Sequence, residues 1–105
     1  AFFQTELDLI LRRLGIRTVI LTGTTTPNCI RTTCYDGLSL DYNILIIEDC
    51  CSSNTEEIQR VNMEDMERVG AVITSSEAFL SDDYEVKDYA AEIQERVQAD
   101  ETAPE

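Results

Sequence analysis

The sequence contains no histidine and has few basic residues. Eight Lys and Arg stand against 21 Asp and Glu among 105 residues, which gives a formal net charge of −13. Without histidine, a Cys–His catalytic pair cannot form within the chain. The acidic balance argues against nucleic acids and anionic membranes as partners, because phosphate groups are bound by clustered Lys and Arg.

Long apolar segments are also missing. The longest run, Ile44–Ile47, is far shorter than the roughly 20 residues of a membrane-spanning helix. No basic and then apolar leader opens the chain. The four cysteines do not have the spacing of a secreted disulfide framework, since Cys50 and Cys51 are adjacent and Cys34 lies within a helical pattern. These features predict a cytoplasmic protein, and without histidine or a Cys-x-x-Cys pair we expect no metal or other cofactor.

The length allows one small domain, but the charge is unevenly distributed along it. Residues 1–76 hold eleven acidic and six basic residues, whereas residues 77–105 hold ten acidic and two basic ones. This change predicts a domain body over 1–76 and an acidic extension over 77–105. The extension should contain one amphipathic helix that packs on the body or on a second subunit, because an apolar stripe is formed by Val86, Tyr89, Ala90, Ile93 and Val97.

The body alternates between helical and strand patterns. Helical spacing predicts helices over about 7–14, 29–38 and 55–70, with Thr5, Asn28 and Thr55 as their N-caps. Short apolar runs predict strands at 18–22, 44–47 and 71–74. The alternation indicates an α/β fold with a parallel sheet. Because the first strand is apolar throughout its centre, we expect cover on both of its faces, so three strands would make only half of a sheet.

Cys29 is the candidate nucleophile. It follows the first strand at the carboxyl edge of the predicted sheet, where ligands bind in open α/β folds. Backbone N–H groups in the first turn of a helix stabilise a thiolate and could hold an oxyanion. The alternative is a buried packing cysteine without chemistry. Asp36 and Asp49 are the candidate bases, but Asp36 lies two helical turns away and Asp49 is more typical of a capping residue for the segment after Cys50-Cys51.

Three segments around Cys29 form a combined sequence pattern. They are Thr-Glu-Leu-Asp-Leu at residues 5–9, Gly-Thr-Thr-Thr-Pro-Asn-Cys-Ile-Arg-Thr-Thr-Cys-Tyr-Asp-Gly at 23–37 and Asp-Tyr-Asn-Ile-Leu-Ile-Ile-Glu-Asp-Cys at 41–50. In combination these motifs resemble the isochorismatase-like cysteine hydrolases, over about the carboxyl-terminal half of the family domain. The resemblance implies a Rossmann-like three-layer α/β/α fold with a parallel sheet, and hydrolysis of C–N bonds in a small amide, imide or carbamoyl substrate.

The resemblance also implies roles for individual residues. Cys29 would be the nucleophile, Thr25 and Thr26 would be joined by a cis peptide bond, and the N–H groups of Thr26 and Cys29 would form the oxyanion hole. The Asp and Lys of the family fall before residue 1, so we expect little turnover from these residues alone. The partner would then be a missing amino-terminal half or a second copy in a homo-oligomer. The alternative is a non-catalytic truncated homologue that acts as an oligomerisation or partner-binding module.

Overall fold

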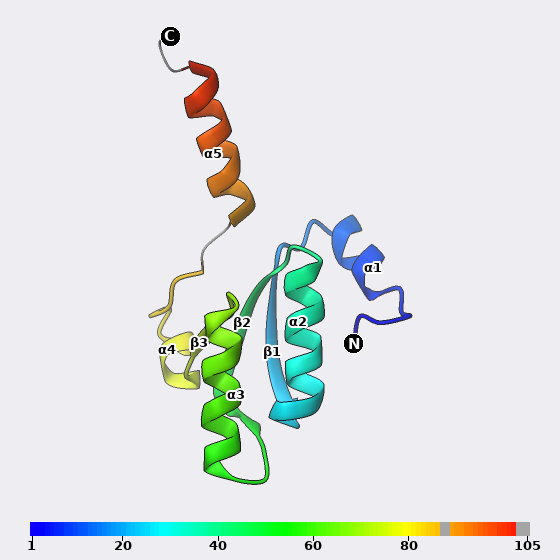
Figure 1. Cartoon of the computed structure of the whole chain (residues 1–105), viewed down its shortest axis with the longest axis vertical. Helices are drawn as coiled ribbons and strands as arrows, with labels where there is room; N and C mark the ends of the chain where they lie inside the picture. The colour runs from blue at the N-terminus through cyan, green and yellow to red at the C-terminus, as the bar shows by residue number, and fades with distance from the viewer. Residues whose placement is uncertain (87–88, 103–105) are drawn as a thin grey trace.

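The protein is an alternating α/β chain whose computed structural model describes residues 1–86 and 89–102 (Figure 1). The body contains, in chain order, α1 (Leu7–Arg13), β1 (Thr18–Thr24), the π-type turn η1 (Thr26–Ile30), α2 (Arg31–Ser39), β2 (Asn43–Ser52), α3 (Glu56–Arg68), β3 (Val72–Thr74) and α4 (Ser76–Leu80). The acidic extension contains α5 (Tyr89–Thr102). No helix among the described residues is both long and apolar enough to cross a membrane.

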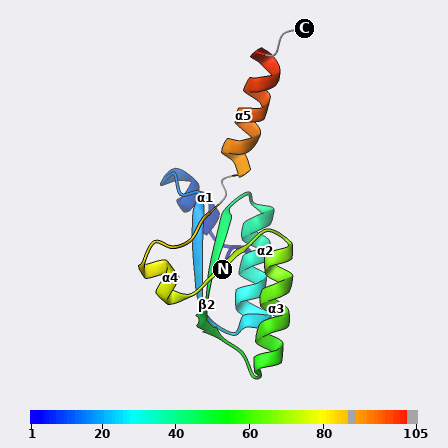
Figure 2. The same cartoon turned by 90° about the vertical axis from the view of Figure 1, so that its left-hand side faces the viewer.

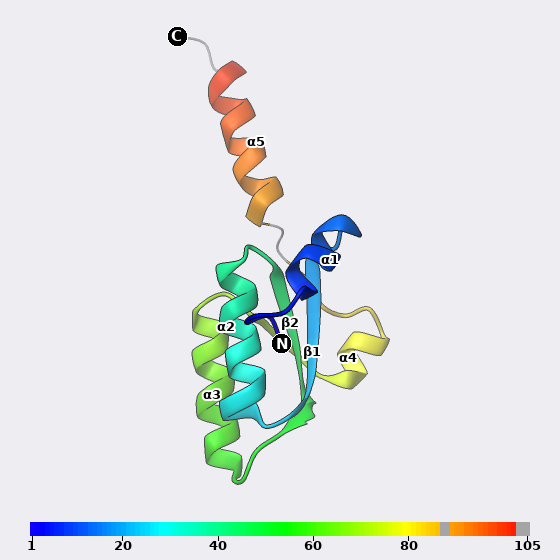
Figure 3. The same ribbon diagram turned by 90° about the vertical axis from the view of Figure 1, so that its right-hand side faces the viewer.

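The three strands form one parallel sheet in the order β1-β2-β3. The pairs Thr18↔Asn43 and Leu45↔Val72 set the register of the two ladders. Helices α2 and α3 lie on one face of the sheet and α4 lies on the other, so the body has the three layers predicted from the sequence (Figures 2 and 3). Each parallel connection crosses through a helix, as parallel pairing requires.

The core lies between the central strand and the two helices on its face. Ile44 and Ile46 of β2 are fully buried and belong to one cluster with Cys34 of α2 and Met66 of α3. Gly37 allows α2 to approach β2 closely. A Cβ atom at this position would lie 2.6 Å from Cδ1 of Ile44, so the packing of α2 on the sheet depends on the missing side chain.

Strand β1 is covered on one face only within these residues. Leu21 faces the core and is buried, whereas Ile20 faces the other side and is 45% exposed. β1 is an edge strand, and α4 packs against β2 behind the sheet and leaves the outer face of β1 open. Cover of this outer face by a partner or by further sequence therefore stays a prediction.

Two of the three predicted caps differ from the structure, and one is confirmed. Thr55 accepts a hydrogen bond from Ile58 N at 3.1 Å and caps α3 as expected. Asn28 does not cap α2, because the helical segment begins earlier, at Thr26. Thr5 precedes the cap position of α1, which is Glu6, although its hydroxyl accepts a bond from Leu7 N at 3.3 Å.

The Gly37→Ala variant tests the close approach of α2 to β2. An alanine in the middle of a helix is normally favourable by about 1 kcal/mol. Here the added methyl group would overlap the buried Ile44 side chain, and overpacking of this kind typically costs about 1–3 kcal/mol. We expect a lower free energy of unfolding in urea. Ser39→Ala, at an exposed position of the same helix, is the control and should not destabilise the protein. An unchanged or raised unfolding midpoint for Gly37→Ala would contradict the packing described.

Candidate functional site

Two strands end together at the edge of the sheet that carries Cys29. Thr24, the last residue of β1, pairs with Ser52, the last residue of β2. The register is interrupted just before this point, since β1 has one residue and β2 has four between the pairs Leu21↔Ile46 and Gly23↔Cys51. Gly23 has a φ of +120°, a conformation that side chains rarely adopt. The irregular end of the ladder therefore leads directly into η1.

The cis peptide bond joins Thr24 to Thr25, not Thr25 to Thr26 as the resemblance implied. The difference is one position within three consecutive threonines, which the sequence pattern does not distinguish. In the structure the bond follows the last residue of β1, and Thr26 is already the first residue of η1.

Two backbone amides of the turn that presents Cys29 are used in bonds to the residue that precedes it. Pro27 has no N–H group. The N–H groups of Asn28 and Ile30 both donate to Thr25 O, at 3.0 and 3.3 Å. Thr26 and Cys29 thus carry the two N–H groups of this turn that remain candidates for an oxyanion hole.

Cys29 is exposed at this edge, which excludes the alternative of a buried packing cysteine. Its neighbour Asn28 is exposed as well, whereas Thr26 and Ile30, at the two ends of η1, are buried. The turn is therefore anchored at both ends and presents its middle to solvent.

The first anchor is the side chain of Thr26, which is completely buried. Its hydroxyl donates to Ser52 O at 3.2 Å. This bond joins the start of η1 to the end of β2, beside the Thr24↔Ser52 pair. It holds the first amide of the turn in a fixed position relative to the sheet.

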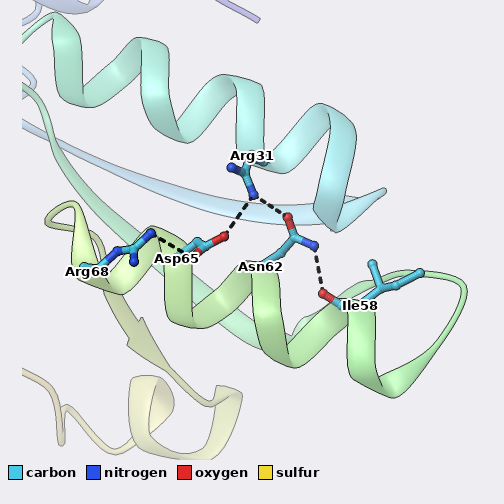
Figure 4. A network of polar contacts seen from close by, with 5 residues as sticks. All are labelled: Arg31, Ile58, Asn62, Asp65 and Arg68. Carbon is cyan, nitrogen blue, oxygen red and sulfur yellow. Dashed lines mark hydrogen bonds and ion pairs between the residues drawn. The ribbon is translucent and has the colours of Figure 1, made fainter.

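The second anchor is Arg31, which begins α2 two residues after Cys29 (Figure 4). Its Nη1 donates to Asn62 Oδ1 at 2.8 Å and pairs with Asp65 Oδ2 at 3.4 Å, both on α3. Asn62 in turn donates from Nδ2 to Ile58 O at 2.8 Å. Because Asn62 is buried, this network fixes the start of α2 against α3 more firmly than an exposed ion pair would.

Neither candidate base is brought into a catalytic arrangement by the contacts observed. Asp36 lines a shallow hollow with Phe2 and Phe3 near the far end of α2. Asp49 accepts bonds from Ser76 N, at 2.7 Å, and from the Ser76 hydroxyl. These bonds lower the pKa of the Asp49 carboxyl. The predicted cap of the segment after Cys50-Cys51 was therefore wrong, because Asp49 binds the first residue of α4, whose N-cap is Ser75.

The other cysteines differ from Cys29 in ways that make them useful references. Burial raises the pKa of the Cys34 thiol to about 11, although the charge of Arg31 opposes the shift. Burial also raises the pKa of the Cys51 thiol. Cys34 therefore packs in the core, as predicted. Cys50 is exposed like Cys29, but it lies within β2 and not on a helical turn.

Sequence reasoning missed both anchors of the turn. The signal for the second was present, because Asn62 is a polar residue on the apolar side of a helix that also carries Ile58 and Met66. The sequence offered no comparable signal for Thr26, since its partner is a backbone carbonyl. Among the described residues, no group of three or more His, Cys, Asp and Glu is placed to hold a metal ion.

A hollow of about 440 Å³ lies beside α3, near the end of β2. Its lining includes the apolar side chains of Cys51, Met63 and Ile73 together with four glutamates and other polar residues. Cys29 does not line this hollow.

Comparisons with known proteins agree on one family. The family model described as the isochorismatase domain matches residues 1–78. The chain is 41% identical over 71 residues to a probable inactive nicotinamidase of Arabidopsis thaliana, covering 67% of this chain and 36% of that protein. It is 29% identical over 79 residues to a maleamate amidohydrolase of Pseudomonas putida, covering 74% of this chain and 37% of the relative.

Solved structures give the same result for the fold. An isochorismatase family protein of Desulfovibrio vulgaris superposes with a TM-score of 0.73 at 38% identity, covering 76% of this chain and 42% of that one. A pyrazinamidase/nicotinamidase of Streptococcus mutans has a TM-score of 0.67 at 32% identity, covering 69% and 40%. The chain thus spans less than half the length of the proteins that it matches.

The Thr26 anchor can be tested with two variants. Thr26→Val keeps the shape of the side chain and removes the O–H donor, so Ser52 O loses its bond. We expect a loss of about 1 kcal/mol in the free energy of unfolding and a shifted amide resonance of Cys29 in an NMR spectrum. Thr26→Ser retains the hydroxyl and should keep the wild-type Cys29 resonance. If Val and Ser move that resonance equally, the hydroxyl does not position the turn.

Proposed function

The chain belongs to the isochorismatase family, and from this premise we propose that it carries the nucleophile of a hydrolase that cleaves a C–N bond in a small amide, imide or carbamoyl compound. The observation that supports this proposal is the exposed Cys29 on a turn anchored at both ends, at the carboxyl edge of the sheet. The activities for which the relatives are named, nicotinamidase and maleamate amidohydrolase, favour an amide nitrogen as the leaving group.

In the proposed reaction the Cys29 thiolate attacks the substrate carbonyl carbon and forms a C–S bond. The carbonyl electron pair moves to oxygen, and the N–H groups of Thr26 and Cys29 donate to this oxyanion. Collapse of the tetrahedral intermediate restores the carbonyl and breaks the C–N bond, and the nitrogen leaves with the proton that the thiol lost. Water then adds to the thioester, the C–S bond breaks, and the acid is released with regeneration of the thiol.

The proton transfers need a base and an acid, because amide nitrogen is a poor leaving group without a proton. Asp49 is engaged with Ser76, and Asp36 lies in the hollow near Phe2. By resemblance, the Asp and Lys of the family lie before residue 1 of this numbering. We therefore assign the proton transfers to groups outside residues 1–105, and expect these residues alone to be acylated readily but to hydrolyse amides slowly.

A second candidate function is a non-catalytic binding module. The word inactive in the name of the Arabidopsis relative is compatible with it, and so is the open outer face of β1 around Ile20. The two candidates differ in what they predict for Cys29. A binding module needs no stabilisation of an oxyanion at this residue, whereas a hydrolase does.

The test compares two reagents at two exposed cysteines. 4-Nitrophenyl acetate reacts through a tetrahedral oxyanion, and its leaving group departs without a proton, so the reaction does not depend on an external acid. Iodoacetamide alkylates the same thiols by displacement, without an oxyanion. For each cysteine, the ratio of the two rates removes the effects of exposure and thiolate content. Quantitative peptide mass spectrometry after timed labelling gives all four rates.

We expect the ester-to-iodoacetamide ratio at Cys29 to exceed that at Cys50 by at least about tenfold, since a single oxyanion-hole donor in a complete enzyme contributes about 10²–10³. Cys50 is the matched control because it is exposed in the same molecule but lies in a strand. The variants Cys29→Ser and Cys50→Ser confirm which peptide carries each label. Equal ratios at the two positions would overturn the hydrolase proposal and leave the binding module.

A further inference from the structure

The carboxyl end of β2 contains a segment that the ladders of the sheet do not pair. The β1–β2 register is interrupted there, and the β2–β3 ladder ends at Ile47. Residues 48–50 have no partner in either ladder of the described sheet, although they lead directly to Cys51 and Ser52. Ser52 O is the acceptor of the buried Thr26 hydroxyl. The position of this carbonyl therefore depends on how the unpaired segment is held.

A side chain of α3 holds this segment. Gln59 Nε2 donates to Glu48 O at 3.0 Å and to Cys51 O at 3.2 Å. Because both acceptors are carbonyl oxygens, the amide nitrogen and not the amide oxygen must face them. The two carbonyls lie at the beginning of the unpaired segment and directly after it. The amide of Gln59 thus joins the two sides of the interruption, immediately before Ser52.

The amide oxygen of Gln59 indicates that packing alone does not account for this residue. Oε1 is buried and accepts no hydrogen bond within the part of the chain that the structure describes. A buried acceptor without a partner is destabilising, and most such atoms in proteins are paired. The oxygen side of this amide is therefore unfavourable, and the two bonds made by Nε2 offset it.

Helix α3 holds both anchors of the turn that presents Cys29. Through Gln59 it fixes the end of β2, where Ser52 O binds the first anchor. Through Asn62, three residues later and therefore next to Gln59 on the helix surface, it binds Arg31, the second anchor (Figure 4). The helix is thus a common support for the two ends of η1.

We propose that Gln59 is a positioning residue for the oxyanion hole at Cys29. Its amide fixes Ser52 O, and the Thr26 hydroxyl then fixes the N–H group of Thr26 relative to this carbonyl. The inference rests on the proposed function and extends the support of the oxyanion hole to α3. Gln59 acts through the backbone and not on the thiol, so its loss should change the geometry of the hole and not the thiolate content of Cys29.

The variant Gln59→Met tests this role, because Met has a similar length and helix propensity but no donor. We expect the Cys29 amide resonance to shift and the ester-to-iodoacetamide ratio at Cys29 to fall at least about threefold, since a misplacement of about 1 Å can cost up to about 100-fold. Arg60→Met is the control and should change neither. Arg60 is the next residue of α3, its side chain is 61% exposed, and it pairs with Glu64 of the same helix. Slow labelling of the buried Cys34 checks that each variant is folded.

A double variant shows whether the effect passes through Thr26. If it does, adding Gln59→Met to Thr26→Val should change the ratio at Cys29 by less than about twofold, because residues of one network are not additive. An equal fall in both backgrounds would mean that Gln59 acts by another route. A wild-type ratio and resonance in Gln59→Met would mean that it does not position the turn. Either result would overturn the proposal.

The Cys29 resonance separates this proposal from the hydrolase proposal. If the wild-type ratio at Cys29 does not exceed that at Cys50, the hydrolase proposal fails. The link from Gln59 to the turn is then decided by the resonance alone. It stands if the resonance moves in Gln59→Met and not in Arg60→Met, and it falls if the two variants move it equally or not at all.

Discussion

The parallel pairing of β1 with β2 is the constraint on which the candidate site depends. Parallel strands end at the same edge of a sheet, so the Thr24↔Ser52 pair brings the exit of β1 beside the exit of β2. The buried Thr26 hydroxyl can then reach Ser52 O. At the other end of the turn, Arg31 is held by Asn62 and Asp65 of α3. Cys29 lies between these anchors, so its exposure results from a fixed turn and not from a loosely held loop.

The Cys29 turn and α1 lie at opposite ends of β1. Cys29 follows the carboxyl end of β1, whereas α1 and Arg17 precede its amino end, where Asn43 N donates to Arg17 O.

The sequence predicted the fold more completely than the site. The alternation of helices and strands, the Thr55 cap and the core position of Cys34 are confirmed, because they follow from local periodicity and hydrogen bonding. The apolar pattern of β1 does not reveal that it lies at an edge of the sheet, where the outer face around Ile20 is open. The cis bond was placed one residue late within three equivalent threonines. Asp49 accepts a hydrogen bond from Ser76 N, a contact across 27 residues that no local pattern encodes.

The central claim is that the turn after β1 binds a carbonyl oxygen at Cys29, and infrared spectroscopy of the acylated protein tests it most directly. Carbon-13 label in the acetyl carbonyl isolates the stretching band of each thioester, and Cys29→Ser and Cys50→Ser variants allow one thioester to be observed at a time. Donation from the N–H groups of Thr26 and Cys29 weakens the carbonyl bond, so the band at Cys29 should lie at lower frequency than the band at Cys50. Bands at the same frequency would mean that no amide of the turn reaches the carbonyl, and the account of the site would be contradicted.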